Sequence, residues 1–203
     1  MEGTIHHSVV LKSCGLDTVI HPFCRIASPD RVTIGNACVL DDLTFLYGDI
    51  IIHDFVHVAA QASLVGEIEI GSYAGVSGGT RVYASSDYFD GRCMTNPCIP
   101  SCFRVADRRP VKIGKHALIG TGAVILPGVT VGEGAVVGAL SLVKEDLEPW
   151  GIYAGTPARR VGTRKRETIE ESALRLEMFA YRDGVYIPRR LWEGQLENMY
   201  GNG

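Results

Sequence analysis

The sequence lacks any apolar run near the roughly 18 residues that a membrane-spanning helix requires. Residues 1–14 also lack the basic-then-apolar order of a secretory signal peptide. No charge sign dominates, because 20 basic and 23 acidic residues give a formal net charge of −3. We therefore expect a cytoplasmic protein without a membrane span, and we do not expect nucleic acid as a partner.

Cysteine is too sparse for a disulfide-stabilised fold, with six residues in 203. These thiols are expected to be free, as in a reducing compartment. The length suits one domain with a single core, and 46% hydrophobic residues exclude a disordered chain. Glycine is plentiful, with 24 residues, which favours a fold with many tight turns.

A repeat of six residues is the main signal in the sequence. Aliphatic residues lead most hexads from Val10 onward, and the fifth positions are small or aliphatic. The leading positions are Val10, Leu16, Pro22, Ser28, Ile34, Leu40, Leu46, Ile52, Val58, Leu64, Ile70, Val76 and Val82. A period of six is three strand periods of two and does not match a helix. It predicts short flat strands separated by corners and stacked as an all-β solenoid, although a β-sandwich is an alternative.

The repeat divides the chain into segments. Residues 10–87 and 113–148 carry hexads, in frames one residue apart, and residues 149–162 close the stack. The break at residues 88–112 is predicted to be an extruded loop, and loops of this length are usually functional. We therefore expect a solenoid domain at residues 1–162 and a helical tail at 163–203. Thr168 and Glu171 resemble a capping box for a helix to about Tyr181, and the tail is expected to cap the last coil.

Four segments carry a family resemblance. IGNACVLDD, IGSYAGVSGG and IGKHALIGTGAVILPGVTVGEGAVVGALSLV resemble the hexapeptide-repeat transferases, and PWGIYAGTPARRV is similar to the closing segment of acetyltransferases in that family. The resemblance covers residues 10–162. It implies a left-handed parallel β-helix, acetyl-CoA as co-substrate, and a homotrimer with active sites between subunits. Within the family, the chain is most similar to sugar O- and N-acetyltransferases, including those that act on nucleotide-linked amino-deoxysugars.

Acyl transfer from a thioester requires a base for the acceptor's proton, and histidine is the first candidate. None of the six histidines occupies a first or fifth hexad position, so those in the repeat should point outward or lie at corners. They are His6, His7, His21, His53, His57 and His116. We predict His57 as the base, with Asp87 orienting it or binding the acceptor across an interface between copies. His116 is either near the thioester or solvated. Galactoside-type relatives have their catalytic histidine where this chain has Asp87.

The loop is rich in cations. Arg92, Arg104, Arg108, Arg109 and Lys112 outnumber its two aspartates. Because guanidinium groups bind phosphate in a bidentate fashion, we predict that Arg92, Arg104 and Arg108 bind a phosphorylated acceptor. A simply solvated loop is the alternative. The three loop cysteines lack the tight pair of a zinc site, and no metal is expected.

The resemblance also implies a coenzyme A site. Thr121 and Ala139 would contact the pantetheine arm through backbone atoms, and their spacing of one coil places them in line. Lys144 would lie near the adenosine end, and Arg159 near a phosphate, with Arg160 beside it. The family often has Thr-Lys where this chain has Lys144 and Glu145.

These features together predict an acetyl-CoA-dependent enzyme. Its expected reaction is N-acetylation of a nucleotide-linked amino-deoxysugar of the dTDP-4-amino-4,6-dideoxyhexose type, for cell-surface polysaccharides such as lipopolysaccharide. O-acetylation of a sugar hydroxyl is the nearest alternative. A metalloenzyme like the γ-type carbonic anhydrases, or a non-catalytic solenoid, is a more distant one.

Overall fold

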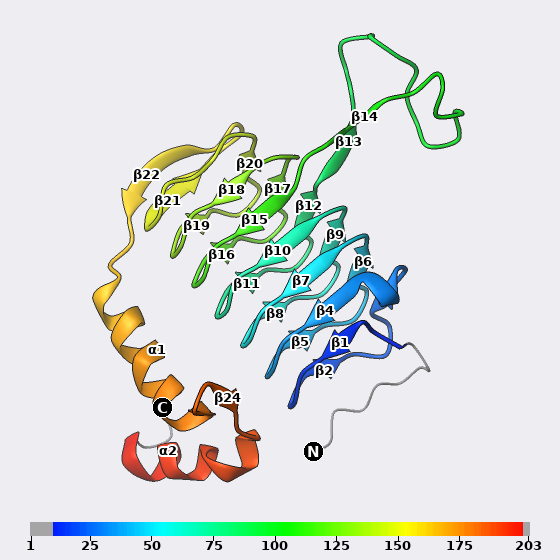
Figure 1. The fold of residues 1–203 in the computed structure, drawn as a ribbon. Coiled ribbons are helices and arrows are strands. Elements are labelled where there is room, and N and C mark those ends of the chain that lie inside the picture. The colour runs from blue at the N-terminus through cyan, green and yellow to red at the C-terminus, as the bar shows by residue number, and fades with distance from the viewer. Residues whose placement is uncertain (1–9, 201–203) are drawn as a thin grey trace.

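The computed structural model describes residues 10–200, which form a three-sided prism of short stacked strands (Figure 1). The first face, sheet A, contains β1 (Ser13–Cys14), β4 (Val32–Ile34), β7 (Ile50–Ile52), β10 (Ile68–Ile70), β15 (Val111–Ile113) and β18 (Thr130–Val131). Sheet B contains β2 (Val19–Ile20), β5 (Val39–Leu40), β8 (His57–Val58), β11 (Gly75–Val76), β16 (Leu118–Ile119), β19 (Val136–Val137), β21 (Gly151–Ala154) and β22 (Arg159–Thr163). Sheet C contains β3 (Arg25–Ile26), β6 (Phe45–Tyr47), β9 (Ser63–Val65), β12 (Arg81–Tyr83), β17 (Val124–Ile125) and β20 (Leu142–Val143).

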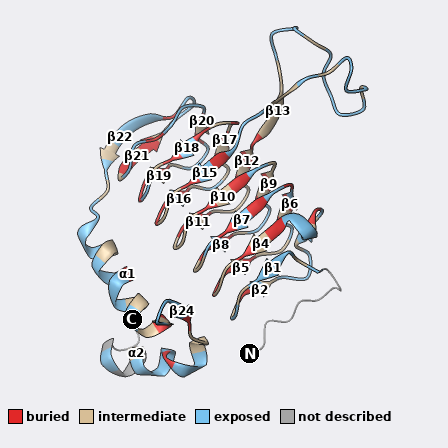
Figure 2. Ribbon diagram, viewed as in Figure 1, coloured by how far each residue is buried: buried red, intermediate tan, exposed pale blue. Residues whose placement is uncertain are grey.

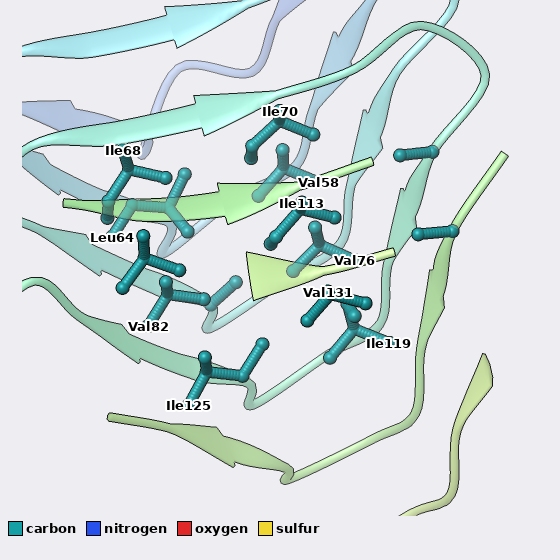
Figure 3. Close-up of a cluster of buried hydrophobic side chains, with 14 of the residues drawn as sticks. Val58, Leu64, Ile68, Ile70, Val76, Val82, Ile113, Ile119, Ile125 and Val131 are labelled. Atoms are coloured by element: carbon teal, nitrogen blue, oxygen red, sulfur yellow. The ribbon is translucent and has the colours of Figure 1, made fainter. Parts of the chain in front are cut away.

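The predicted β-helix is confirmed by the strand register. Val32 pairs in parallel with Ile50, and Ile50 with Ile68, so each coil takes 18 residues, or three hexads. Alternation within a strand sends Ile50 and Ile52 into the prism and leaves Ile51 45% exposed. The inward residues of successive coils stack into one apolar core, as Figure 3 shows for Val58, Val76 and Ile119. Figure 2 shows the buried positions following the strands along the prism.

A long loop interrupts the coils without disturbing their register. Ile68 of β10 pairs with Val111 of β15, so the intervening insertion is extruded from the stack. Its stem is an antiparallel ribbon of β13 (Ser85–Asp87) and β14 (Ala106–Arg108), which projects from the prism in Figure 1. The sequence placed the loop at 88–112, but the ribbon starts earlier, and Val111 and Lys112 already belong to β15.

The tail does not cap the last coil, and that expectation is wrong. Antiparallel pairing with β22 already covers β21 of the last coil. The tail contains α1 (Glu167–Ala180), β23 (Tyr181–Arg182), β24 (Val185–Tyr186), a 3-10 turn η2 (Arg189–Leu191) and α2 (Glu193–Tyr200). It runs back along the edge between sheets A and B, where the Tyr186 hydroxyl donates to Asp17 of the first coil at 3.0 Å. The capping box is also wrong, because α1 begins at Glu167 with Thr168 inside it and no side-chain cap bond.

The physical reason for this path is an aromatic row on that edge. The corner residues Phe55, Tyr73, His116 and Trp150 all have left-handed backbone conformations that point their rings outward. Phe55 stacks on Tyr73 at 5.2 Å, and Tyr73 on His116 at 5.0 Å. Tail residues pack over the row, with Trp192 only 5% exposed. His116 is therefore buried under the tail. The sequence suggested a place near the thioester or a solvated one, and the structure shows neither.

Candidate active site

The corner between sheets B and C carries the residues expected to meet the pantetheine arm. The Leu140 N–H donates to the Thr121 carbonyl at 2.9 Å, and the Gly122 N–H to the Gly78 carbonyl at 3.0 Å. Thr121 and Ala139 therefore lie on successive coils in equivalent corner positions, and both are exposed. The coil below adds Ser77 and Gly78. Small residues keep the backbone of this corner accessible, so a ligand with amide groups can reach its polar atoms.

His57 lies on sheet B next to this corner. It pairs in register with Gly75 of the following coil, two residues before Ser77. Its Nε2 is 3.0 Å from Oδ2 of Asp41, a corner residue of the preceding coil. The Nε2 of His21 lies 3.9 Å from the other oxygen of the same carboxylate. The His57 side chain is 56% exposed, so an imidazole oriented by a carboxylate faces outward, as a general base must.

Asp87 makes a different set of contacts. It ends β13, where it accepts hydrogen bonds from the Asn96 N–H at 2.9 Å and the Arg104 Nε at 2.7 Å. The Asn96 N–H and then the Arg104 guanidinium hold the pKa of Asp87 below its usual value. Within one protomer, the carboxylate that orients His57 is thus Asp41, while Asp87 organises the loop.

The loop cations differ in their availability. Arg92 pairs with Asp90 through its Nε at 2.8 Å, and Arg104 with Asp87 at 2.7 Å. Arg109 pairs with Asp107 at 2.7 Å. Within residues 10–200, Arg108 on β14 forms no ion pair or side-chain hydrogen bond, and it is exposed. Of the three predicted acceptor-binding arginines, Arg108 is thus the one whose charge remains open to a ligand.

The three cations expected at the adenosine and phosphate end of the coenzyme do come together. Lys144, Arg159 and Arg160 line a pocket of about 130 Å³ at the last coil. Glu145 lies among them, 3.5 Å from Lys144 Nζ and 3.8 Å from Arg159 Nη1. Asp146 also lines the pocket, so three cations face two carboxylates and the lining keeps a small net positive charge.

Among residues 10–200, no group of three or more His, Cys, Asp or Glu side chains is arranged to hold a metal ion. No helix in the same range is long and apolar enough to cross a membrane. His6 and His7 lie outside the described residues.

Comparison with known proteins decides the family. A family profile described as "Bacterial transferase hexapeptide (six repeats)" matches residues 110–145. An Escherichia coli protein, dTDP-4-amino-4,6-dideoxy-D-glucose acyltransferase, is 37% identical over 78% of this chain and 85% of its own length. The chain belongs to the hexapeptide-repeat acyltransferases. This acyltransferase accordingly has the family's left-handed β-helix and uses an acyl-CoA co-substrate.

Solved structures give the same result. AntD, an N-acyltransferase from Bacillus cereus, superposes with a TM-score of 0.80 and 35% identity, covering 84% of this chain and 93% of that one. That complex contains dTDP-4-amino-4,6-dideoxyglucose and coenzyme A, and another contains dTDP and 3-hydroxybutyryl-CoA. Some AntD complexes are of variants in which one serine, or one aspartate ten positions after it, is replaced.

Two residues of this site escaped the sequence prediction. Asp41 lies 16 residues before His57, close to one coil length, so the repeat itself held the signal that the two would be neighbours. Ser77 lies on the coil below Thr121, at the corner that the pantetheine residues mark. A serine at a corner has no distinguishing sequence pattern, because serine is common in turns.

Proposed function

We propose that this acyltransferase N-acylates the amino group of a nucleotide-linked amino-deoxysugar of the dTDP-4-amino-4,6-dideoxyhexose type, with acetyl-CoA as a donor. The observation that carries this proposal is the presence of two features on one protomer. One is an exposed backbone corner at Thr121 and Ala139, and the other is a cation-bearing loop whose Arg108 forms no ion pair within residues 10–200. The first suits the amide groups of pantetheine, and the second suits a diphosphate. AntD, similar over most of its length, binds both kinds of ligand.

The proposed chemistry is direct transfer. The acceptor amine attacks the thioester carbonyl carbon, the new C–N bond forms, and the C–S bond breaks with release of the coenzyme thiolate. His57 takes the proton that the nitrogen loses, and Asp41 stabilises the resulting imidazolium. The proton then passes to the thiolate, which restores the neutral imidazole.

Asp87 has a positioning role in this proposal. Its bonds to Asn96 and Arg104 hold the loop in the shape that receives the acceptor. Ser77 and Asp87 are the one serine and aspartate of this chain separated by ten positions in that order. The AntD variants replace residues with the same separation, which supports a role for Ser77 and Asp87 in the proposed reaction.

For the co-substrate, we place the pantetheine arm against Thr121 and Ala139 and the phosphates in the pocket of Lys144, Arg159 and Arg160. The support is that the pocket and the corner belong to the same last coils of the prism. The loop arginines Arg92 and Arg104 contribute to acceptor binding through the loop that they hold, and Arg108 contacts the acceptor directly.

We further propose a homotrimer with active sites between subunits. The support is an apolar outer surface on sheet B and its corner, where Leu118 is 41% and Leu140 76% exposed. The proposed location is the cytoplasm, which the six free cysteines favour. The proposed role is supply of an activated sugar for cell-surface polysaccharide such as lipopolysaccharide, because nucleotide-linked sugars are donors for glycosyl transfer.

The experiment is thiol release from acetyl-CoA with matched acceptors. The nucleotide-linked sugar with an amino group at carbon 4 should release thiol, whereas the same sugar with a hydroxyl there should not. Equal release from both, or release from the hydroxyl sugar alone, would contradict N-acylation.

A further inference from the structure

Phe89 is the most exposed large apolar side chain among the described residues, at 91%. It follows the stem of the loop directly, between Tyr88 and Asp90. The neighbouring ring, Tyr88, is already covered by the Arg92 guanidinium, which lies 4.2 Å from its centroid. An aromatic ring left wholly in water forgoes the favourable burial of its apolar surface. The ring of Phe89 is therefore open to a partner outside the described protomer.

The register of the stem below Phe89 shows which groups share a face. Ser85 pairs with Arg108, and Asp87 with Ala106, and alternate residues of a strand share one face. Arg108 and Asp87 are thus on the same face, and the ion pair between Asp87 and Arg104 continues that face toward the loop tip.

The opposite face carries the other set of side chains. Asp107 belongs to it as the partner of Ser86, and Arg92 lies over the ring of Tyr88, two residues after Ser86. The alternation of the stem ends there, and Phe89 follows at a bend, two residues beyond the end of β13. Arg108, which forms no ion pair within residues 10–200, lies at the base of the same stem, opposite Ser85.

The separation of Arg108 and Phe89 along the loop suits one class of ligand. Four residues separate Ser85, opposite Arg108, from Phe89, which corresponds to about 13 Å of extended strand. A free cation at one end and a free aromatic ring at the other follow the order of groups in a nucleoside diphosphate. We infer that Phe89 is the platform on which the nucleobase of the acceptor stacks, while Arg108 meets the diphosphate. This inference rests on the proposed function and assigns its acceptor specificity to the loop.

Stacking fits an exposed residue better than hydrogen-bonded recognition does. Every base presents a flat face, so an aromatic ring binds it without a preformed pocket, and the loss on truncation to alanine is substantial. The other exposed phenylalanine of the loop, Phe103 at 62%, lies on the returning arm, where its N–H donates to the Pro100 carbonyl at 2.9 Å. Phe103 is therefore the matched control.

The test measures dTDP binding by calorimetry to the full-length protein, with acetyl-CoA binding alongside. Phe89→Ala should weaken dTDP binding roughly ten-fold or more, and Phe89→Trp should retain it within about three-fold, because a larger ring still stacks. Phe103→Ala should match the unchanged protein. Affinity for acetyl-CoA should stay the same in all three variants.

Two results would overturn the inference. One is unchanged dTDP binding in Phe89→Ala. The other is a changed sedimentation coefficient in Phe89→Ala with joint loss of both ligands, which would make Phe89 a contact between copies of the chain. Failure of the unchanged protein to bind dTDP at all would instead overturn the proposed function, so the two failures are distinguishable.

Discussion

Asp41 and His57 face each other from neighbouring coils, with Oδ2 of the carboxylate 3.0 Å from Nε2 of the imidazole. The β-helix creates this contact, because one coil of 18 residues brings a corner residue beside a strand residue of the next coil. The carboxylate fixes the orientation of the ring through this contact. An exposed imidazole next to the pantetheine corner is thereby equipped to accept a proton.

Replacing this imidazole should lower turnover. His57→Gln is expected to reduce kcat roughly 100-fold or more, because a positioned general base typically contributes that much. Asp41→Asn should give a smaller loss, since the ring stays but loses its orientation. Steady-state thiol release with saturating acceptor measures both.

His53→Gln provides the matched control. His53 lies in the same hexad as His57, four residues before it, and is comparably exposed. Its Nε2 has its own carboxylate partner, Glu69, at 3.1 Å. It lies on the side of sheet A, away from the corner of Thr121 and Ala139. Its replacement should leave kcat unchanged, and an equal loss in both variants would remove His57 from the mechanism.

The phosphate pocket predicts a loss confined to the coenzyme. Arg159→Ala should raise the KM for acetyl-CoA roughly five- to ten-fold and leave the KM for the acceptor unchanged, because one charge-assisted contact is removed. Glu145→Gln should lower the same KM, since it removes an anion from the pocket. Arg175→Ala on the outer side of α1 is the control. If the KM for acetyl-CoA is unchanged in both Arg159→Ala and Glu145→Gln, the coenzyme phosphates bind elsewhere.

The aromatic edge predicts a stability difference between two glycines. Gly134 has φ +64, and a Cβ there would strike the Trp150 ring. Gly184, with φ +76, has nothing within 4 Å. Gly184→Ala should cost about 1 kcal/mol from backbone strain alone. Gly134→Ala should cost about 1–3 kcal/mol more from overpacking. Denaturant midpoints measure both, and equal losses would contradict the packing described here.

The buried His116 predicts a pH dependence of stability. Burial, and then the charge of Lys115, lowers its pKa below 6.5 in the folded protein. As pH falls below 6.5, the unfolded chain binds a proton before the folded one does, so the stability present above 6.5 is lost progressively toward the folded pKa. His116→Asn, which tolerates the left-handed backbone, should flatten the decline between about pH 7.5 and about pH 5.5. If the unfolding midpoint of His116→Asn falls with pH as much as that of the unchanged protein, the pH dependence does not come from His116.

The sequence predicts the coils well because their physics is local and periodic. Each hexad supplies its own inward residues, so Val32, Ile50 and Ile68 are recognisable before their pairing is known. The loop is equally visible as a break in the repeat. Only its predicted ends differ from the structure, because Ser85 and Val111 are residues that suit either a coil or a loop. The stacking of Thr121 on the coil of Ala139 follows from coil length alone.

The path of the tail and the partners of charged side chains were not predictable in this way. Tyr186 meets Asp17 from the far end of the chain, and no periodicity links them. Arg92 and Arg104 look alike in sequence to Arg108, yet the first two are neutralised by loop aspartates. Such contacts depend on how the loop folds back on its stem, which composition does not specify.

The most direct test is the product of one reaction. The protein, incubated with acetyl-CoA and dTDP-4-amino-4,6-dideoxyglucose, should convert the sugar to a derivative whose NMR spectrum shows a new amide at carbon 4, with one thiol released per amide formed. An unchanged sugar under conditions in which the protein binds both ligands, or an ester in place of the amide, would contradict the account.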